Sequence, residues 1–125
     1  GMRCIFTDRE LSRDNFNLNH FIPRQIVGHD HNWNILPTDT SFAECNYVPS
    51  LNHYLPLMAA EQHEALRVYI PRSKPNDVVL GQYQELGYTS ADLLEMSDEK
   101  FLDTYFSTFI PLSQKALTEG YNMLQ

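Results

Sequence analysis

The sequence has few cysteines and no long apolar run, and each shortage excludes a class of protein. Two cysteines, Cys4 and Cys45, are too few for a disulfide framework. They lack the Cys-x-x-Cys spacing, and a structural zinc site usually takes four ligands, so we expect no structural zinc and interpret both thiols as packing residues. No segment approaches the roughly 20 apolar residues that span a bilayer, so we expect no membrane partner.

The start of the chain also lacks a targeting pattern. Gly1-Met2-Arg3-Cys4 contains no apolar signal-peptide core, so we expect a cytoplasmic location. The length of 125 residues suits one domain, or a small core with an appended helical part. A larger parent protein, with this chain as one piece of it, is equally compatible with the sequence.

Positive charge is scarce as well. Nine Lys and Arg residues stand against sixteen Asp and Glu, a net charge of -7. Residues 1–50 hold four basic and six acidic residues, and residues 51–125 hold five and ten. A protein that grips DNA through its phosphates usually presents a basic face, so the composition disfavours strong non-specific DNA binding by this chain alone.

The first fifty residues predict short elements, placed by apolar alternation and by turn residues. Phe16, Leu18 and His20 alternate with the residues between them, which is typical of a strand that Pro23 ends. The full expectation is a strand over residues 3–7, a strand over 16–21, a loop over 24–33, an extended piece over 33–36, and a short helix from Asp39 or Thr40 to Cys45.

The second half predicts helices. Pro56 suits the first turn of a helix that runs to Pro71. The further signals, in chain order, are a helix capped by Asn76 or Asp77 with Gly87 as its stop, a turn capped by Ser90, a helix starting at Ser97, and a last helix that Pro111 begins or kinks.

Two proline-ended segments carry the most functional information. They read Asn19-His20-Phe21-Ile22-Pro23 and Trp33-Asn34-Ile35-Leu36-Pro37. Further matching segments, in order, are Cys4-Ile5-Phe6-Thr7, Val27-Gly28-His29-Asp30, Thr40-Ser41 and Val48-Pro49-Ser50-Leu51. The ordered set, over about residues 4–55, resembles the HNH endonuclease family, the ββα-metal or His-Me finger nucleases.

The resemblance implies a fold and a mechanism. The fold is α+β, with a ββα-metal core in residues 1–55 and a helical extension over 56–125 packed on it. The family hydrolyses phosphodiesters of DNA with one divalent cation, Mg²⁺ or similar, that stabilises the transition state. By position, His20 is the general base that takes a proton from water. Asn34 ties the loop that aims the histidine, and Asn19 takes the place of the first metal ligand.

The chain departs from the family pattern at the metal. Asn19 replaces an aspartate, although hard cations prefer carboxylates. Ala43 stands where the family places its helix ligand, which leaves Glu44 or Asn46 as substitutes. Arg24 is a candidate phosphate contact. Loop histidines 29 and 31 can join His20 on a metal, although such histidines are more often solvated.

Three functions therefore stay open at the level of sequence. The first is a metal-dependent DNA endonuclease with His20 as its base. The second is an HNH-fold module that has lost catalysis and binds a protein partner. The third is a fragment of a larger nuclease or defence protein whose DNA contacts lie outside this chain. The retained His20 and Asn34 favour the first, while Ala43 and the missing basic patch favour the other two.

Overall fold

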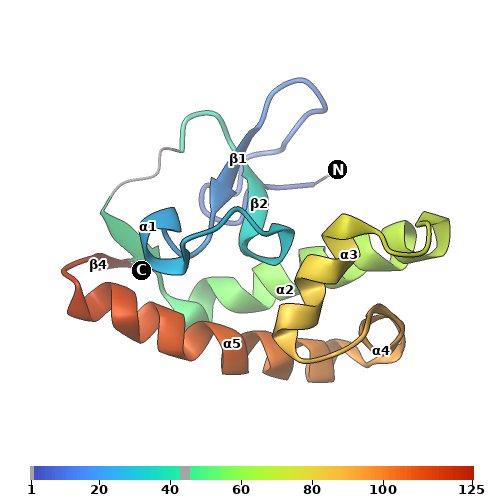
Figure 1. Ribbon diagram of the computed structural model, residues 1–125. Coiled ribbons are helices and arrows are strands. Elements are labelled where there is room, and N and C mark those ends of the chain that lie inside the picture. Colours follow the sequence, from blue (N-terminus) through green and yellow to red (C-terminus); the bar gives the residue numbers. More distant parts are fainter. Residues whose placement is uncertain (1, 43–45) are drawn as a thin grey trace.

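The computed structural model describes residues 2–42 and 46–125, and this part of the chain has an α+β fold (Figure 1). Its helices are α1 (Arg24–Val27), α2 (Leu51–Tyr69), α3 (Val78–Tyr83), α4 (Ser90–Glu95) and α5 (Asp98–Thr118). Short 3-10 turns cover Asn32–Asn34, Ile70–Arg72 and Gln84–Leu86. The strands are β1 (Asn17–His20), β2 (Ile35–Thr38), β3 (Tyr47–Pro49) and β4 (Asn122–Leu124). They pair as two small sheets, β1 with β2 and β3 with β4.

Strands β1 and β2 form an antiparallel pair that runs from Asn17 opposite Thr38 to His20 opposite Ile35. The strand predicted over 16–21 is confirmed in its central part. The connection is not the open loop that we predicted, because it holds α1 and a 3-10 turn. Ile26 is buried in the core, and this burial gives the segment a reason to fold that its polar composition hides.

The strand predicted over residues 3–7 is wrong. Its last three residues form a turn, and Arg3 makes only an isolated bridge with Glu10. The N–H of Asp8 donates to the carbonyl of Cys4 at 2.9 Å, with Asp8 in a left-handed conformation. The chain thus reverses within a few residues, and Cys4 is buried at the start of this turn.

The short helix predicted from Asp39 or Thr40 is wrong over the residues that the structure describes. The carboxylate of Asp39 accepts hydrogen bonds from the backbone N–H and the hydroxyl of Ser41, each at 3.1 Å. Such a contact two residues ahead holds a turn and competes with a helix. The remainder of that prediction, Ala43 to Cys45, lies outside the described residues.

Both long helices run through a proline, where we expected Pro56 in a first turn and Pro111 at the start or at a kink of a last helix. Helix α2 begins at Leu51, so Pro56 lies inside it and the helix crosses the expected end of the core at residue 55. Pro111 lies inside α5, which continues to Thr118. A proline costs a helix interior about 3 kcal/mol. The buried stripe of α5 on both sides of Pro111 offsets this cost, and its members are Phe101, Thr104, Tyr105, Phe109, Ser113 and Ala116.

The local signals at the helix ends are mostly right. The side chain of Asp77 caps α3, and that of Ser97 caps α5, as predicted. Gly87 takes a left-handed conformation where the stop was predicted. The cap of α4 is Thr89 and not Ser90, which is the first residue of the helix.

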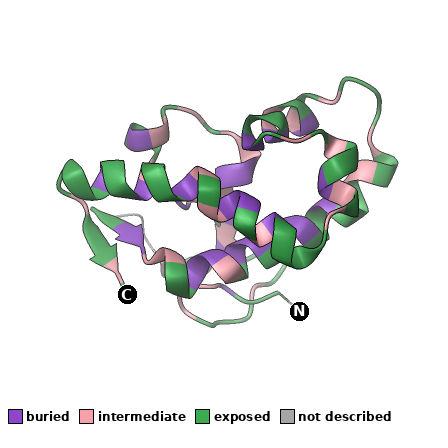
Figure 2. Cartoon of the chain, turned by 90° about the horizontal axis from the view of Figure 1, so that it is seen from below, coloured by how far each residue is buried: buried purple, intermediate pink, exposed green. Residues whose placement is uncertain are grey.

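The core joins the β1–β2 hairpin to the helical second half. Phe21 and Trp33 both meet the ring of Phe109 edge-on, with centroids 5.4 Å and 5.5 Å apart. The Tyr105 hydroxyl donates to the carbonyl of Trp33 at 3.2 Å. Buried residues lie along the inner faces of α2 and α5 (Figure 2). The β1–β2 hairpin and its connection therefore pack against helix α5.

Two features were not predicted by the sequence. Strand β3 pairs in parallel with β4, which lies next to the end of the chain. The hydroxyl of Tyr54 on α2 also donates to the carbonyl of Gln125 at 2.7 Å. Among the residues described, no helix combines the length and the apolar character that crossing a membrane requires.

Candidate active site

His20 lies at the end of β1, and its side chain is 17% exposed. Its Nε2 is 2.9 Å from Oδ1 of Asp30, in the loop after α1. Arg24, the first residue of α1, donates from its Nε to the same oxygen at 2.9 Å. The β1–β2 connection thus brings together the expected base, the expected phosphate contact and a carboxylate to which sequence reasoning gave no role.

The carboxylate of Asp30 is the acceptor that joins Arg24 and His20. Hydrogen bonds from Arg24, and next from His20, hold the pKa of the Asp30 carboxyl below its ordinary value. The carboxylate is therefore ionised at neutral pH and acts as the acceptor. The contact with Asp30 holds the imidazole ring of His20 in one orientation.

Asn34 holds the loop on which these residues depend. Its Oδ1 accepts from the backbone N–H of Ile22 at 2.9 Å, and its Nδ2 donates to the carbonyl of Ile22 at 2.9 Å. Both residues are fully buried. The amide side chain therefore satisfies two backbone groups directly after β1 that would otherwise be buried without partners. Asn34 therefore ties the segment after β1 to the start of β2.

The positions expected to hold Mg²⁺ do not fit that ion in the described residues. The amide nitrogen of Asn19 donates to the hydroxyl of Thr38. Successive residues of a strand face opposite sides, so Asn19 does not share the face of His20. Asn46 is exposed beside β3, and Glu44 lies outside the described residues. Amides bring no charge, whereas Mg²⁺ prefers carboxylate oxygens.

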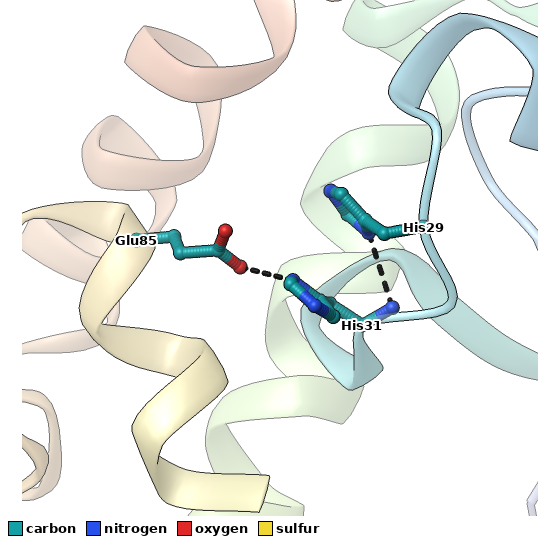
Figure 3. Close-up of side chains that lie close together, drawn as sticks. All are labelled: His29, His31 and Glu85. Carbon is teal, nitrogen blue, oxygen red and sulfur yellow. Dashed lines mark hydrogen bonds and ion pairs between the residues drawn. The ribbon is translucent and has the colours of Figure 1, made fainter.

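A second cluster lies in the same loop. His29 and His31 have stacked rings with centroids 3.9 Å apart, and Nδ1 of His31 contacts Oε1 of Glu85 (Figure 3). One ligand atom from each of the three residues lies within 4.8 Å of the other two. The indole N–H of Trp33 donates to the same oxygen of Glu85 at 2.9 Å. Glu85 lies in the 3-10 turn after α3, so the cluster joins two distant segments.

The local environment sets the charges of this cluster. Burial, and next the neighbouring His31, lower the pKa of His29 below its ordinary value. For Glu85, burial acts in the raising direction, but hydrogen bonds from Trp33 and His31 outweigh it and lower the pKa of the carboxyl. At neutral pH the cluster therefore combines an ionised carboxylate with a neutral imidazole of His29.

Sequence reasoning missed the roles of Asp30 and Glu85. A signal for Asp30 existed, since it follows the first strand within a loop that returns beside that strand. Glu85 had none, because 54 positions separate it from His31. Comparisons with protein-family models, with curated proteins and with solved structures find no match to this chain.

Proposed function

We propose that this chain is an HNH-type nuclease domain that hydrolyses phosphodiester bonds of DNA with His20 as its general base. The observation that carries the proposal is the contact of His20 with Asp30 at the end of β1, in a loop tied by the buried Asn34. The order of elements adds support, because an antiparallel hairpin precedes a long helix in the ββα arrangement. The long helix that follows this hairpin is α2, which begins at Leu51 directly after β3.

The chemistry follows from three side chains. Asp30 holds the His20 ring in place, and His20 is the base that takes a proton from the water that attacks phosphorus. A positioned histidine base contributes about 10²- to 10⁴-fold to such a step. Arg24 brings a permanent positive charge to the same carboxylate, where it can also meet a phosphate oxygen. Asn19 and Asn46, the expected metal positions among the described residues, bring no charge for Mg²⁺, so no metal ion is assigned a role in this step.

DNA is the proposed substrate, with most of its contacts supplied from elsewhere. A net charge of -7 gives this chain little general attraction for phosphates. A larger parent protein, or a partner with a basic face, would supply the missing contacts to the DNA phosphates. We therefore expect weak binding of DNA by the isolated chain, even if cleavage occurs.

A second candidate function rests on the metal positions. The Asn19 amide is hydrogen-bonded to Thr38, and Ala43 carries no donor atom. These two features favour an HNH-fold module that has lost catalysis and serves as an interaction domain. In that case the two hydrogen bonds of Asn34 with the backbone of Ile22 only stabilise the fold.

Plasmid nicking separates the two candidates. Supercoiled DNA is incubated with purified protein in EDTA and with Mg²⁺, Mn²⁺, Ni²⁺ or Zn²⁺ in turn. The nuclease proposal expects nicking that His20→Ala abolishes and that Asp30→Asn weakens. His53→Ala is the matched control, since His53 is an exposed histidine of α2. Circular dichroism verifies that each variant is folded.

Two outcomes would overturn the nuclease proposal. One is a folded wild-type protein that nicks DNA under none of these conditions. The other is nicking that survives His20→Ala unchanged, which would point to a contaminating enzyme. Either result would leave the interaction module as the better account and direct the work to finding its protein partner.

A further inference from the structure

The cluster of His29, His31 and Glu85 has the chemistry of a transition-metal site. It offers two imidazole nitrogens and one carboxylate oxygen, with one ligand atom of each within 4.8 Å of the others (Figure 3). We propose that these three residues bind one Zn²⁺ ion, or a similar borderline cation. Water would complete the coordination. Three protein ligands with an open fourth position form a known class of zinc site.

The geometry requires only local movement. Ligands placed about 2.0–2.2 Å from a tetrahedral zinc ion lie roughly 3.3 Å from one another. The ligand atoms, which lie within 4.8 Å of one another, must therefore approach by up to about 1.5 Å at the longest separation. Glu85 and His29 belong to exposed or half-buried segments, so side-chain rotations can close this gap. The stacked imidazoles must also tilt, because two parallel rings do not aim their lone pairs at one point.

The donor atoms are close to the state that a metal requires. Nδ1 of His29 accepts a hydrogen bond from the backbone N–H of His31 at 3.1 Å, so this nitrogen carries a lone pair. Binding at that atom replaces one hydrogen bond. Nδ1 of His31 faces Oε1 of Glu85, so zinc would take the place of the proton between them. Glu85 is already oriented by Trp33, in the manner of the outer hydrogen bonds that orient metal ligands.

The donor set selects the type of cation. Imidazole nitrogen suits zinc, nickel, cobalt and copper, whereas Mg²⁺ prefers oxygen donors and keeps its waters. The site thus differs from the Mg²⁺ position that the family resemblance implies. It also differs from the cysteine zinc site that the composition excludes. Zinc bound here would link the β1–β2 connection to the turn after α3. A hydrogen bond from the N–H of Asn32 to Oε1 of Gln82, at 2.9 Å, already joins the same two segments.

Binding is measured without nucleic acid, so the result does not depend on the nuclease proposal. Untagged, metal-free protein is titrated with Zn²⁺ and with Mg²⁺ by calorimetry. Co²⁺ is then added as a spectroscopic probe, because its visible absorption reports the coordination. We expect one Zn²⁺ per chain, a rise in the melting temperature, no binding of Mg²⁺ and an absorption band with Co²⁺.

Three variants test the assignment. His31→Ala and Glu85→Gln should each lower the zinc affinity by more than about 10-fold, the loss typical of groups that only support a ligand. Glu85→Gln keeps an oxygen that can accept from Trp33, so its fold should be preserved. His53→Ala is the control and should bind zinc like the wild type. Absence of zinc binding by the folded wild type would overturn the proposal, as would equal affinities in all three variants.

Discussion

Replacement of Asn34 by alanine tests the structural argument for the candidate site most directly. The change removes both hydrogen bonds to the backbone of Ile22 and leaves a buried N–H and a buried carbonyl without partners. Each orphaned group costs about 1–3 kcal/mol, so the free energy of unfolding should fall by about 2–6 kcal/mol. A domain has only about 5–15 kcal/mol in total, so the loss would be a large share of its stability.

Urea unfolding followed by fluorescence measures this loss. Trp33 is the only tryptophan, is buried, and directly precedes Asn34, so its emission reports the same loop. The matched control is Asn17→Ala, an exposed asparagine at the start of β1, which should change the free energy of unfolding by less than about 0.5 kcal/mol. The reasoning is refuted if Asn34→Ala costs no more than this control.

The variant Asn34→Asp separates the two hydrogen bonds. An ionised aspartate still accepts from the N–H of Ile22, but it cannot donate to the carbonyl and it buries a charge. We expect a loss of stability at neutral pH that shrinks when the carboxyl is protonated. A loss that does not change between neutral and acid pH would contradict this account.

Two further predictions concern Glu61 and Ser97. Burial raises the pKa of Glu61 from 4.5 to about 7, and its Oε2 is buried without a hydrogen-bond partner. Between these two pH values the native state holds a proton that the unfolded chain has lost, so stability falls as the pH rises through this window. Solvent screening of the exposed part of Glu61 reduces the full effect of about 3 kcal/mol to roughly 1–2 kcal/mol. Glu61→Gln should therefore stabilise the protein by that amount at about pH 8 and hardly at all below about pH 4.5. Thermal melts of the variant and the wild type over a series of pH values measure this, and a stability difference that does not change with pH would contradict the raised pKa of Glu61. Ser97→Ala removes the cap of α5, in which the serine hydroxyl accepts from the N–H of Lys100 at 3.1 Å, and should cost about 1 kcal/mol in a urea titration. Ser97→Asp, which can still cap, should restore the stability, and no difference between the two variants would argue against a capping role.

The parts of the fold that were predicted well depend on neighbouring residues. The caps at Asp77 and Ser97 and the stop at Gly87 follow from contacts within one helical turn. The central part of the first strand followed from its alternation. Asn34 and His20 could be named as candidates, whose roles stay predictions, because the family resemblance rests on the order and spacing of one stretch of sequence.

The errors share a different cause, since at each of them distant residues outweighed the local signal. Pro56 and Pro111 are tolerated inside α2 and α5 because the apolar stripes around them are buried against each other and the hairpin. The segment of residues 3–7 has the composition of a strand, but among the described residues it has only the isolated bridge of Arg3 with Glu10, and residues 5–7 fold as a turn. Local propensity is a weak prior that packing overrides.

The chemistry of the two clusters belongs to the tertiary structure. The contact of Asp30 with His20 depends on how the β1–β2 connection closes, and that of Glu85 with His31 depends on how α3 packs against that connection. The pairing of β3 with β4 likewise joins residues near 48 to residues near 123. Contacts between positions so far apart leave no periodic trace in the sequence. They form because apolar residues of the hairpin, α2, α3 and α5 are buried together in one core.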